Sequence, residues 1–460
     1  MTVLRRFVLF VLVASLFAPA VSATLPASAG GTPRPNVLII VTDDQRTDTM
    51  AVMPNVQKWF EQLGTSYSNT YVGTPLCCPS RATIMTGRYA HNHGVVDNSA
   101  HHTLDQRTTL QHQLRRTGYR TAIVGKYFNG WPLHQKPRYF DRWSIFRSGY
   151  YNAKFSIDGK VRIVGRYSTD FIARQSGRYL NGFEKRDGEP WMMYVTPSAP
   201  HHPFTATPDY ATAPVPPWDP SPSVEEEDRS DKPPYVRTQG ADRFGAESLR
   251  AAQLRTLMSV DDMVGTLMTD LIELRELERT LVFFLSDNGF FWAEHGLTDK
   301  RLPYTEAINV PLYARWPGYI EAGEIDRRLV SLVDLAPTVL QAAGVPADPF
   351  LPQPDGRSLL EVWDRDHVYI EYFPDNAAVN IGPWASMRTR TDQYSEYYGF
   401  GGVSEFEEYY DLEDDPFQLR NLLGDVSPGN DPPPTELQAM ASQLSNDRSC
   451  QGTSGPNPCP

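Results

Sequence analysis

Two pairs of oxygen-bearing residues each follow a strongly apolar run. Asp43 and Asp44 come directly after the run NVLIIVT, and Asp287 and Asn288 come directly after TLVFFLS. Carboxylate and amide oxygens are ligands for hard cations such as Ca²⁺ or Mg²⁺, whereas zinc sites use mainly histidine and cysteine. Either pair alone could instead cap a helix or a turn. The repetition of the pattern after two buried runs favours a metal site.

The segment PLCCPSR (75–81) offers a second kind of chemistry. Pro79 and Ser80 stand where a helix could begin, because proline is tolerated in the first helical turn. The N-terminus of a helix attracts anions through its free N–H groups, and Arg81 would add guanidinium donors. A cysteine at such a place, Cys77 or Cys78, could be a reactive thiol or an inert buried one. The segment therefore predicts an anion site beside a cysteine.

Both acidic pairs need strands that deliver them to the same place. The first run, 36–42, is continuous and rich in β-branched residues, which is typical of a strand buried on both faces of a parallel sheet. Similar runs recur at 121–124, 191–196, 280–286 and 310–315. Apolar residues with helical spacing lie between them at 54–63, 110–117 and 247–277. This alternation predicts an α/β fold with a large, mostly parallel sheet and helices on both faces, whose strands bring their carboxyl-end residues to one edge.

The sequence after Gly344 has a different character. A Pro/Asp/Gly connector covers 345–357, and short aromatic strands are expected at 367–373, 384–389 and 394–398, with a helix at 435–444. We therefore expect a catalytic α/β domain over 36–345 and a smaller C-terminal α+β subdomain with an antiparallel sheet over 346–460. Cys450 and Cys459 lie close together in a Gly/Pro/Ser tail and are expected to pair in an oxidising compartment.

The first residues have the pattern of an export signal. Arg5 and Arg6 precede an apolar run, and the small residues Val21-Ser22-Ala23 offer a cleavage site. The apolar run is shorter than the roughly 20 residues that a membrane-spanning helix needs. We expect a signal peptide over 1–23 with cleavage near Ala23, then a Pro/Gly/Ala linker over 24–35. The mature protein is expected to be secreted, extracellular or periplasmic, without a membrane span.

The charge balance limits the class of partner. The chain has 460 residues, 43 of them basic and 55 acidic, which gives a formal net charge of −12, and 40% of its residues are hydrophobic. That composition is ordinary for a globular protein and excludes a wholly disordered or fibrous chain. A nucleic-acid binder would carry a basic surplus, so no nucleic-acid partner is expected. A local basic pocket for an anionic substrate remains compatible with the acidic total.

The motifs together resemble one enzyme family. CCPSR (77–81) matches the C-x-P-S-R signature of the type I sulfatases, and the TGR that follows it and the two acidic-pair segments also match, in the family's order. The resemblance covers essentially the whole mature chain and implies an alkaline-phosphatase-like fold. The Cys-Cys form, HNH (91–93), GKYFN (125–129) and DKR (299–301) look most like N-acetylglucosamine-6-sulfatases and their extracellular heparan-sulfatase relatives.

The resemblance implies a set of roles for individual residues. Cys77 would be oxidised after translation by a formylglycine-generating enzyme to Cα-formylglycine, whose hydrate is the nucleophile, while Cys78 would stay unmodified. Asp43, Asp44, Asp287 and Asn288 would hold Ca²⁺, with Mg²⁺ as the alternative and an oxygen of the modified residue 77 as a further ligand. The family positions that bind sulfate and handle protons correspond here to Arg81, Lys126, His201 and Lys300.

The implied reaction is the hydrolysis of a sulfate ester. The cation and the basic side chains would neutralise the sulfuryl oxygens. Asp287 would accept the proton of the nucleophile, and His201 or Lys300 would protonate the departing sugar oxygen. The substrate is then a sulfated carbohydrate or a small sulfate ester, with 6-O-sulfated N-acetylglucosamine as the best guess. Residues 205–245 form a surface excursion, and we expect the sugar-contacting loops in 130–190 and 205–245.

One position departs from the common family pattern. The pattern G-K-W-H has a histidine two residues after its lysine, and here that position is Phe128. Asn129, His91 and His93 are candidates for the missing group.

Two other functions fit the same residues. One is a phosphomonoester or phosphodiester hydrolase of the same superfamily, and the other is a non-catalytic secreted glycan-binding protein with an unmodified Cys77. The state of residue 77 and the number of metal ions distinguish these readings.

Overall fold

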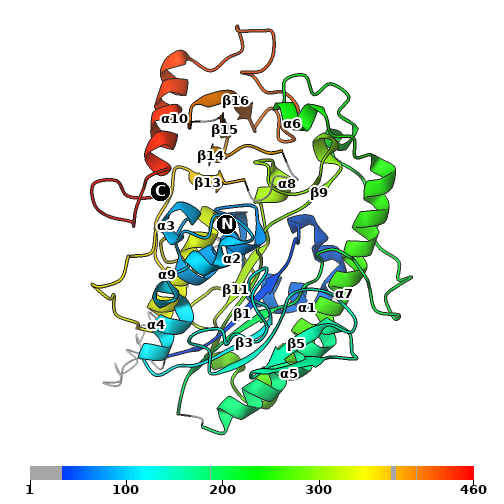
Figure 1. Cartoon of the computed structure of the whole chain (residues 1–460), viewed down its shortest axis with the longest axis vertical. Helices are drawn as coiled ribbons and strands as arrows, with labels where there is room; N and C mark the ends of the chain where they lie inside the picture. The colour runs from blue at the N-terminus through cyan, green and yellow to red at the C-terminus, as the bar shows by residue number, and fades with distance from the viewer. Residues whose placement is uncertain (1–33, 187, 375–379, 400) are drawn as a thin grey trace, which may run out of the picture. The chain divides into compact units, whose positions relative to one another are not determined.

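A ten-stranded mixed β-sheet lies at the centre of the computed structural model (Figure 1). Its strands, in spatial order, are β12 (Glu324–Ser331), β2 (Thr65–Tyr71), β11 (Leu312–Arg315), β8 (Thr280–Ser286), β1 (Asn36–Thr42), β7 (Trp191–Thr196), β3 (Arg120–Lys126), β4 (Arg142–Phe146), β5 (Lys154–Ile157) and β6 (Lys160–Ile163). The five neighbours from β8 to β4 run parallel, whereas β11 and the β5–β6 hairpin run antiparallel to their neighbours.

The structure describes residues 34–186, 188–374, 380–399 and 401–460. The expected signal peptide over 1–23 and most of the expected linker lie outside this part of the chain. Residues 34–460 form one compact unit. No helix in the described part of the chain has the length and apolar character that crossing a bilayer requires.

Alternate residues of β1 face two different apolar cores. Val37 and Ile39 pack on the side of α2 (Cys77–Thr86), α4 (Leu110–Arg116) and α9 (Leu335–Ala342). Leu38 and Ile40 pack on the side of α5 (Ser168–Glu184) and α7 (Arg243–Glu273). Figure 1 shows these two groups of helices on opposite sides of the central strands. The continuous apolar run of β1 thus reflects burial on both faces of the sheet.

The C-terminal part contains a second, antiparallel sheet. Its four strands, in spatial order, are β13 (Val368–Tyr372), β14 (Trp384–Arg388), β15 (Asp392–Tyr398) and β16 (Ser404–Asp411), and α10 (Pro434–Asp447) lies beside them (Figure 1). Cys450 and Cys459 form the expected disulfide. Val368, Ile370 and Trp384 belong to the same apolar core as α2 and α9, so this sheet packs against the main one.

The predicted fold class is confirmed. The large sheet is covered by helices on both faces, and the smaller antiparallel sheet follows it in sequence. The division into domains at residue 345 stays a prediction about the organisation of the sequence.

Candidate active site

The carboxyl ends of β1 and β8 bring the two acidic pairs together. Thr42 and Ser286 are paired in register, so the residues that follow them leave the sheet side by side. The backbone N–H of Asp44 donates to Asp287 Oδ1 at 3.2 Å. Carboxylate oxygens of Asp43, Asp44 and Asp287 all lie within 4.8 Å of one another, and all three residues are buried. The parallel pairing of these two strands thus produces a concentrated acidic cluster.

Asn288 completes this cluster with an amide. Its Nδ2 donates to Asp44 Oδ1 at 2.7 Å, whereas its buried Oδ1 has no hydrogen-bond partner among the described residues. A buried amide oxygen without a partner is costly. Three carboxylates and one free amide oxygen at one point are the donor set that Ca²⁺ or Mg²⁺ takes. The residues present therefore fit a hard divalent cation.

Three buried cationic side chains surround the acidic cluster. Arg81 Nη2 lies 2.8 Å from Asp287 Oδ2 and 3.6 Å from Asp43 Oδ2, and its Nη1 donates to the backbone oxygen of Lys126 at 3.1 Å. Lys126 Nζ donates to Asp43 Oδ2 at 2.5 Å. Lys300 Nζ forms a close ion pair with Asp44. Buried charges are tolerated where they are paired in this way.

Burial and charge act in opposite directions on the carboxylates. Burial alone would raise the pKa of Asp43, but Lys126, His201 and Arg81 outweigh it and hold that pKa below its ordinary value. Burial raises the pKa of Asp287 to about 6, although Arg81 opposes the shift. Of these two carboxylates, Asp43 therefore keeps its negative charge, and Asp287 takes up a proton more readily.

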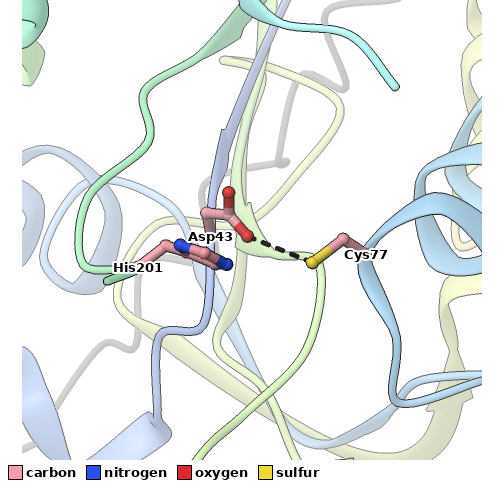
Figure 2. Close-up of side chains that lie close together, drawn as sticks. All are labelled: Asp43, Cys77 and His201. Carbon is pink, nitrogen blue, oxygen red and sulfur yellow. Dashed lines mark hydrogen bonds between the residues drawn. The ribbon is translucent and has the colours of Figure 1, made fainter. Parts of the chain in front are cut away.

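Cys77 is the first residue of α2 and faces the acidic cluster. Its Sγ lies 3.5 Å from Asp43 Oδ1, and Lys300 Nζ lies 3.2 Å from the same sulfur. Figure 2 shows the sulfur directed at the Asp43 carboxylate, with the ring of His201 beside them. Burial raises the pKa of the Cys77 thiol to about 12. The unmodified thiol is thus protonated near neutral pH, which disfavours a role as a thiolate nucleophile.

Cys78 has a different environment from its neighbour. Its Sγ accepts a hydrogen bond from the backbone N–H of Asn129 at 3.0 Å, and its backbone N–H donates to Asn98 Oδ1 at 3.0 Å. Asn98 thereby satisfies a free N–H group in the first turn of α2. No local sequence pattern indicates this capping role, since Asn98 lies twenty residues beyond the cysteine.

His201 lies at the solvent side of the site. Its ring Nε2 is 3.9 Å from Asp44 Oδ2, and its side chain is 28% exposed, whereas His202 is an exposed residue outside the cluster. The hydroxyl of Tyr150 donates to the backbone oxygen of His201 at 2.6 Å. Tyr150 follows β4 and lies in the 130–190 segment where sugar-contacting loops were expected, although it was not named individually.

Lys300 lies in a loop whose backbone has several positive φ angles. Ala293, His295, Asp299 and Arg301 all have positive φ angles, between 52° and 89°, a region that non-glycine residues rarely adopt. The loop is held by contacts from the 205–245 excursion: His295 Nδ1 lies 2.8 Å from Glu226 Oε2, and Arg229 donates to the backbone oxygen of His295 at 2.6 Å. The position of Lys300 therefore depends on a strained segment that other parts of the chain fix.

The residue that replaces the family histidine does not reach the site. Phe128 is fully buried in the apolar core, where its ring packs against Tyr127 and Trp131. Asn129 is partly buried, and its Oδ1 is without a partner in the described part of the chain. Asn129 also contacts Cys78 rather than Cys77 through its backbone.

The two histidines considered as substitutes are engaged elsewhere. Both ring nitrogens of His91 have partners, Glu371 and the backbone oxygen of Cys450. The ring of His93 accepts from the N–H of Val95 and contacts Thr83 Oγ1. Neither ring is directed at Cys77, so the structure gives no support to either histidine as the missing group.

The sequence of the chain is similar to those of known sulfatases. The sulfatase family model matches residues 35–345, and a model described as the C-terminal part of N-sulphoglucosamine sulphohydrolase matches 293–443. The chain is 32% identical to an N-acetylglucosamine-6-sulfatase of Homo sapiens, over 87% of this chain and 83% of that protein. It is 28% identical to an N-acetylglucosamine-6-O-sulfatase of Bacteroides thetaiotaomicron, over 85% of this chain and 83% of that one.

Solved structures share the fold at lower identity. A protein solved with its substrate D-glucosamine-2-N,6-O-disulfate aligns with a TM-score of 0.77 at 24% identity, covering 90% of this chain and 98% of its own. A phosphonate monoester hydrolase of Agrobacterium radiobacter aligns with a TM-score of 0.71 at 22% identity, covering 90% of this chain and 95% of its own. The same fold therefore carries more than one hydrolytic chemistry.

Proposed function

The chain belongs to the sulfatase family, and we propose that it releases inorganic sulfate from sulfated sugars through a Cα-formylglycine at position 77 and a bound Ca²⁺. Membership of the family makes the protein a sulfuric ester hydrolase. One observation carries the finer proposal: the side chain of Cys77 lies between the carboxylate of Asp43 and the amine of Lys300, at the start of a buried helix.

Four side chains at the sheet edge are proposed to hold the cation. These are the three buried carboxylates and the amide whose Oδ1 has no protein partner, namely Asp43, Asp44, Asp287 and Asn288. Ca²⁺ is our choice, with Mg²⁺ as the alternative. When bound, the ion would neutralise sulfuryl oxygens and lower the pKa of the hydroxyl at residue 77, whose modified form would supply the nucleophile.

The protein's own charges prepare the site for a sulfate ester. Three buried cations balance three buried carboxylates, so a divalent ion would give the site an excess of positive charge. Arg81 is fixed by Asp287 and by the backbone of Lys126, which suits it to hold the acidic residues in place. Lys126 and Lys300 are the cations that we propose to face the sulfuryl oxygens.

The proposed proton transfers use groups already in contact with the cluster. Asp287, whose pKa burial raises to about 6, would accept a proton from the hydroxyl that the modified residue 77 would carry. His201 and Lys300 are the two candidates to protonate the departing sugar oxygen. We favour His201, because its ring is partly open to solvent, while Lys300 is committed to an ion pair with Asp44.

The proposed substrate is 6-O-sulfated N-acetylglucosamine. The names of two relatives that this chain matches over most of their length support that choice. The test is to incubate the mature enzyme with N-acetylglucosamine 6-sulfate and with the corresponding 6-phosphate, and to measure the released anion. We expect sulfate release at least about 100-fold faster than phosphate release, a difference of roughly 2.7 kcal/mol in transition-state stabilisation. Faster phosphate release would favour a phosphomonoesterase, and binding without release would favour a glycan-binding protein.

The remaining proposals concern the export, maturation and domain organisation of the protein. A signal peptide over 1–23, cleaved near Ala23, would export it, and a formylglycine-generating enzyme would modify Cys77 during maturation. Residues 36–345 would then form the catalytic domain and 346–460 the C-terminal subdomain.

A further inference from the structure

The thiol of Cys77 brings a second kind of metal ligand to the acidic cluster. Cys77 Sγ, a ring nitrogen of His201 and a carboxylate oxygen of Asp43 all lie within 4.8 Å of one another. Figure 2 shows these three side chains meeting from separate parts of the chain. Thiolate, imidazole and carboxylate are ligands of zinc, whereas Ca²⁺ takes oxygen ligands. The cluster therefore contains two overlapping donor sets, one of oxygens alone and one that includes sulfur and nitrogen.

The separation of the sulfur and the carboxylate matches a tetrahedral zinc site. Zn–S and Zn–O bonds of about 2.3 Å and about 2.0 Å at a tetrahedral angle put the two ligand atoms about 3.5 Å apart. Cys77 Sγ lies 3.5 Å from Asp43 Oδ1. The other carboxylate oxygen, Oδ2, faces Lys126 and Arg81. Oδ1 is therefore the oxygen of Asp43 that remains for a metal ion on the sulfur side.

A hydrogen bond of His201 leaves the ring nitrogen that faces the cluster free to bind a metal. Nδ1 lies 2.9 Å from the backbone oxygen of His202, which can only accept, so Nδ1 carries the hydrogen of the neutral ring. Nε2 then presents its lone pair 3.9 Å from Asp44 Oδ2. Zinc-bound histidines have this arrangement, in which the second nitrogen donates to a carbonyl. The His201 side chain is 28% exposed, which gives an ion a path from solvent.

The buried cations around the cluster leave room for a zinc thiolate. Each of the three is paired with a carboxylate of the cluster, so their charges are already balanced. A thiolate adds one more negative charge, and a bound Zn²⁺ then leaves less net positive charge in the site than Ca²⁺ beside a neutral thiol does. Lys300 Nζ lies 3.2 Å from Cys77 Sγ, and an amine at that distance favours the thiolate that zinc needs.

We propose that the chemical state of residue 77 decides which metal ion the site takes: the unconverted chain binds Zn²⁺ through Cys77, His201 and Asp43, and the converted chain binds Ca²⁺. The zinc site goes beyond the proposed function, and the calcium half of the statement rests on it. Zn²⁺ and the thiol form a zinc thiolate, and the thiol proton is released to water. Because Asp43 belongs to both donor sets, the two ions compete. A molecule that escapes conversion thus holds zinc at the residue that should become the nucleophile.

The test uses the chain made in a host without a formylglycine-generating enzyme, with the intact thiol confirmed by mass spectrometry. After treatment with a chelator, Zn²⁺ and Ca²⁺ are titrated separately by calorimetry into the parent, Cys77→Ser and Cys78→Ala. Cys78 is the matched control because it is the other free cysteine of the chain. We expect one Zn²⁺ per chain, bound about 100-fold more weakly by Cys77→Ser and within about threefold of the parent by Cys78→Ala. The Ca²⁺ affinity should change by less than about threefold in both variants.

Absorption of the Cd²⁺ complex is an independent measurement, because a cadmium–thiolate bond gives a charge-transfer band that oxygen and nitrogen ligands do not. We expect this band in the parent and in Cys78→Ala, and no band in Cys77→Ser. His201→Gln should keep the band and weaken Zn²⁺ binding about tenfold. The converted chain, whose residue 77 has no sulfur, gives the same comparison without a substitution and should show no band. Equal Zn²⁺ affinity in the parent and Cys77→Ser, or a band that disappears only in Cys78→Ala, would overturn the proposal.

The results for the two ions separate this inference from the proposed function. Failure of the unconverted chain to bind Zn²⁺, together with sulfate release by the converted chain, would overturn this inference alone. Zn²⁺ binding that depends on Cys77, in a chain that binds no Ca²⁺ in either form, would support the zinc site and contradict the proposed calcium site.

Discussion

At the scale of the residue, two adjacent cysteines have opposite surroundings. Cys77 faces carboxylates and a lysine amine, while Cys78 contacts the backbone of Asn129 and the cap residue Asn98. The turn of the helix between them explains the difference, because successive helical residues point about 100° apart. Of the two cysteines, Cys77 is therefore the one whose side chain can take part in chemistry at the acidic cluster.

Substituting each cysteine by alanine tests this assignment. We expect Cys77→Ala to lower sulfate release by about 1,000-fold or more, because the nucleophile is lost. Cys78→Ala removes only a buried sulfur and should retain most activity, with a loss in stability of about 1–2 kcal/mol. The measurement is sulfate release together with a urea denaturation curve for each variant. Equal loss of activity in two folded variants would contradict the assignment of the nucleophile.

His93 gives a prediction about pH and stability. Burial lowers its pKa to about 3, and the charges of Arg88 and His91 act in the same direction. The neutral ring is therefore kept in the folded state, while the unfolded chain binds a proton below about pH 6.5. The stability that depends on this group is complete above pH 6.5 and decreases as the pH falls towards 3.

The measurement is the free energy of unfolding in urea at pH 7 and pH 5. The parent should lose about 2 kcal/mol more between these values than the variant His93→Gln does. His102→Gln, at an exposed histidine, is the control and should behave like the parent. The account of His93 would be wrong if the two variants showed the same pH dependence.

At the scale of the element, the loop that carries Lys300 is the most constrained part of the site. Its backbone enters the left-handed region at several non-glycine residues, which costs energy that the surrounding contacts must offset. Glu226 supplies one such contact to His295, and it also lies 3.3 Å from the buried amine of Lys232. The loop and the excursion thus act together to place one amine.

Glu226→Gln tests this coupling. We expect kcat to fall about tenfold with little change in KM, because a small displacement of Lys300 weakens stabilisation of the transition state more than binding of the substrate. Glu225→Gln is a matched control, since the Glu225 side chain is 63% exposed and pairs with an exposed arginine at the surface. The measurement is kcat and KM for sulfate release by both variants. An equal effect in both would show that Glu226 does not position the lysine.

Within the main sheet, the sequence predicted strands that are buried on both faces and missed strands that carry polar or exposed positions. The runs that became β1, β7 and β8 were predicted with their observed bounds, because every position in them is buried and their central residues are continuously apolar. β2, with the sequence TSYSNTY, has several polar residues and no continuous apolar run, so it was not recognised. The β5–β6 hairpin was missed for the same reason, since β6 is exposed along its whole length.

In the site as well, residues that belong to sequence motifs were predicted, and residues that reach the site through long-range contacts were not. The residues expected to bind the metal and the sulfate do meet at one edge of the sheet, because their motifs follow strand ends or begin a helix. His91 and His93, the candidates for the missing group, do not join them. Tyr150, Asn98 and Glu226 reach the site only through long-range packing, which no local pattern records. Their roles could be found only once the fold was known.

At the scale of the whole molecule, a cation at the proposed site should matter for stability as well as for activity. Three buried carboxylates lie close together at the carboxyl ends of β1 and β8, two strands in the middle of the sheet. A ligand that binds the folded state stabilises it, by about 2.7 kcal/mol when its concentration is 100 times the dissociation constant. Removal of the ion should therefore lower the stability of the folded protein and stop turnover.

Dialysis against a chelator tests this expectation. We expect sulfate release to fall below about 1% of its starting value and Tm to fall by several degrees, with both restored by Ca²⁺. Calorimetry and an activity assay on the same sample provide the measurement. Unchanged Tm and activity after dialysis would contradict the metal assignment, and restoration by Mg²⁺ but not by Ca²⁺ would change the identity of the ion.

A peptide mass spectrum across residue 77 determines whether that residue becomes the nucleophile of a sulfatase. The protein should be isolated from a host that has a formylglycine-generating enzyme, because Cys77 is only 1% exposed once folded. We predict a peptide in which one CH₂–SH group has become CHO, with the change located at residue 77 and not at 78. An intact thiol at 77 in protein that releases sulfate would contradict the account.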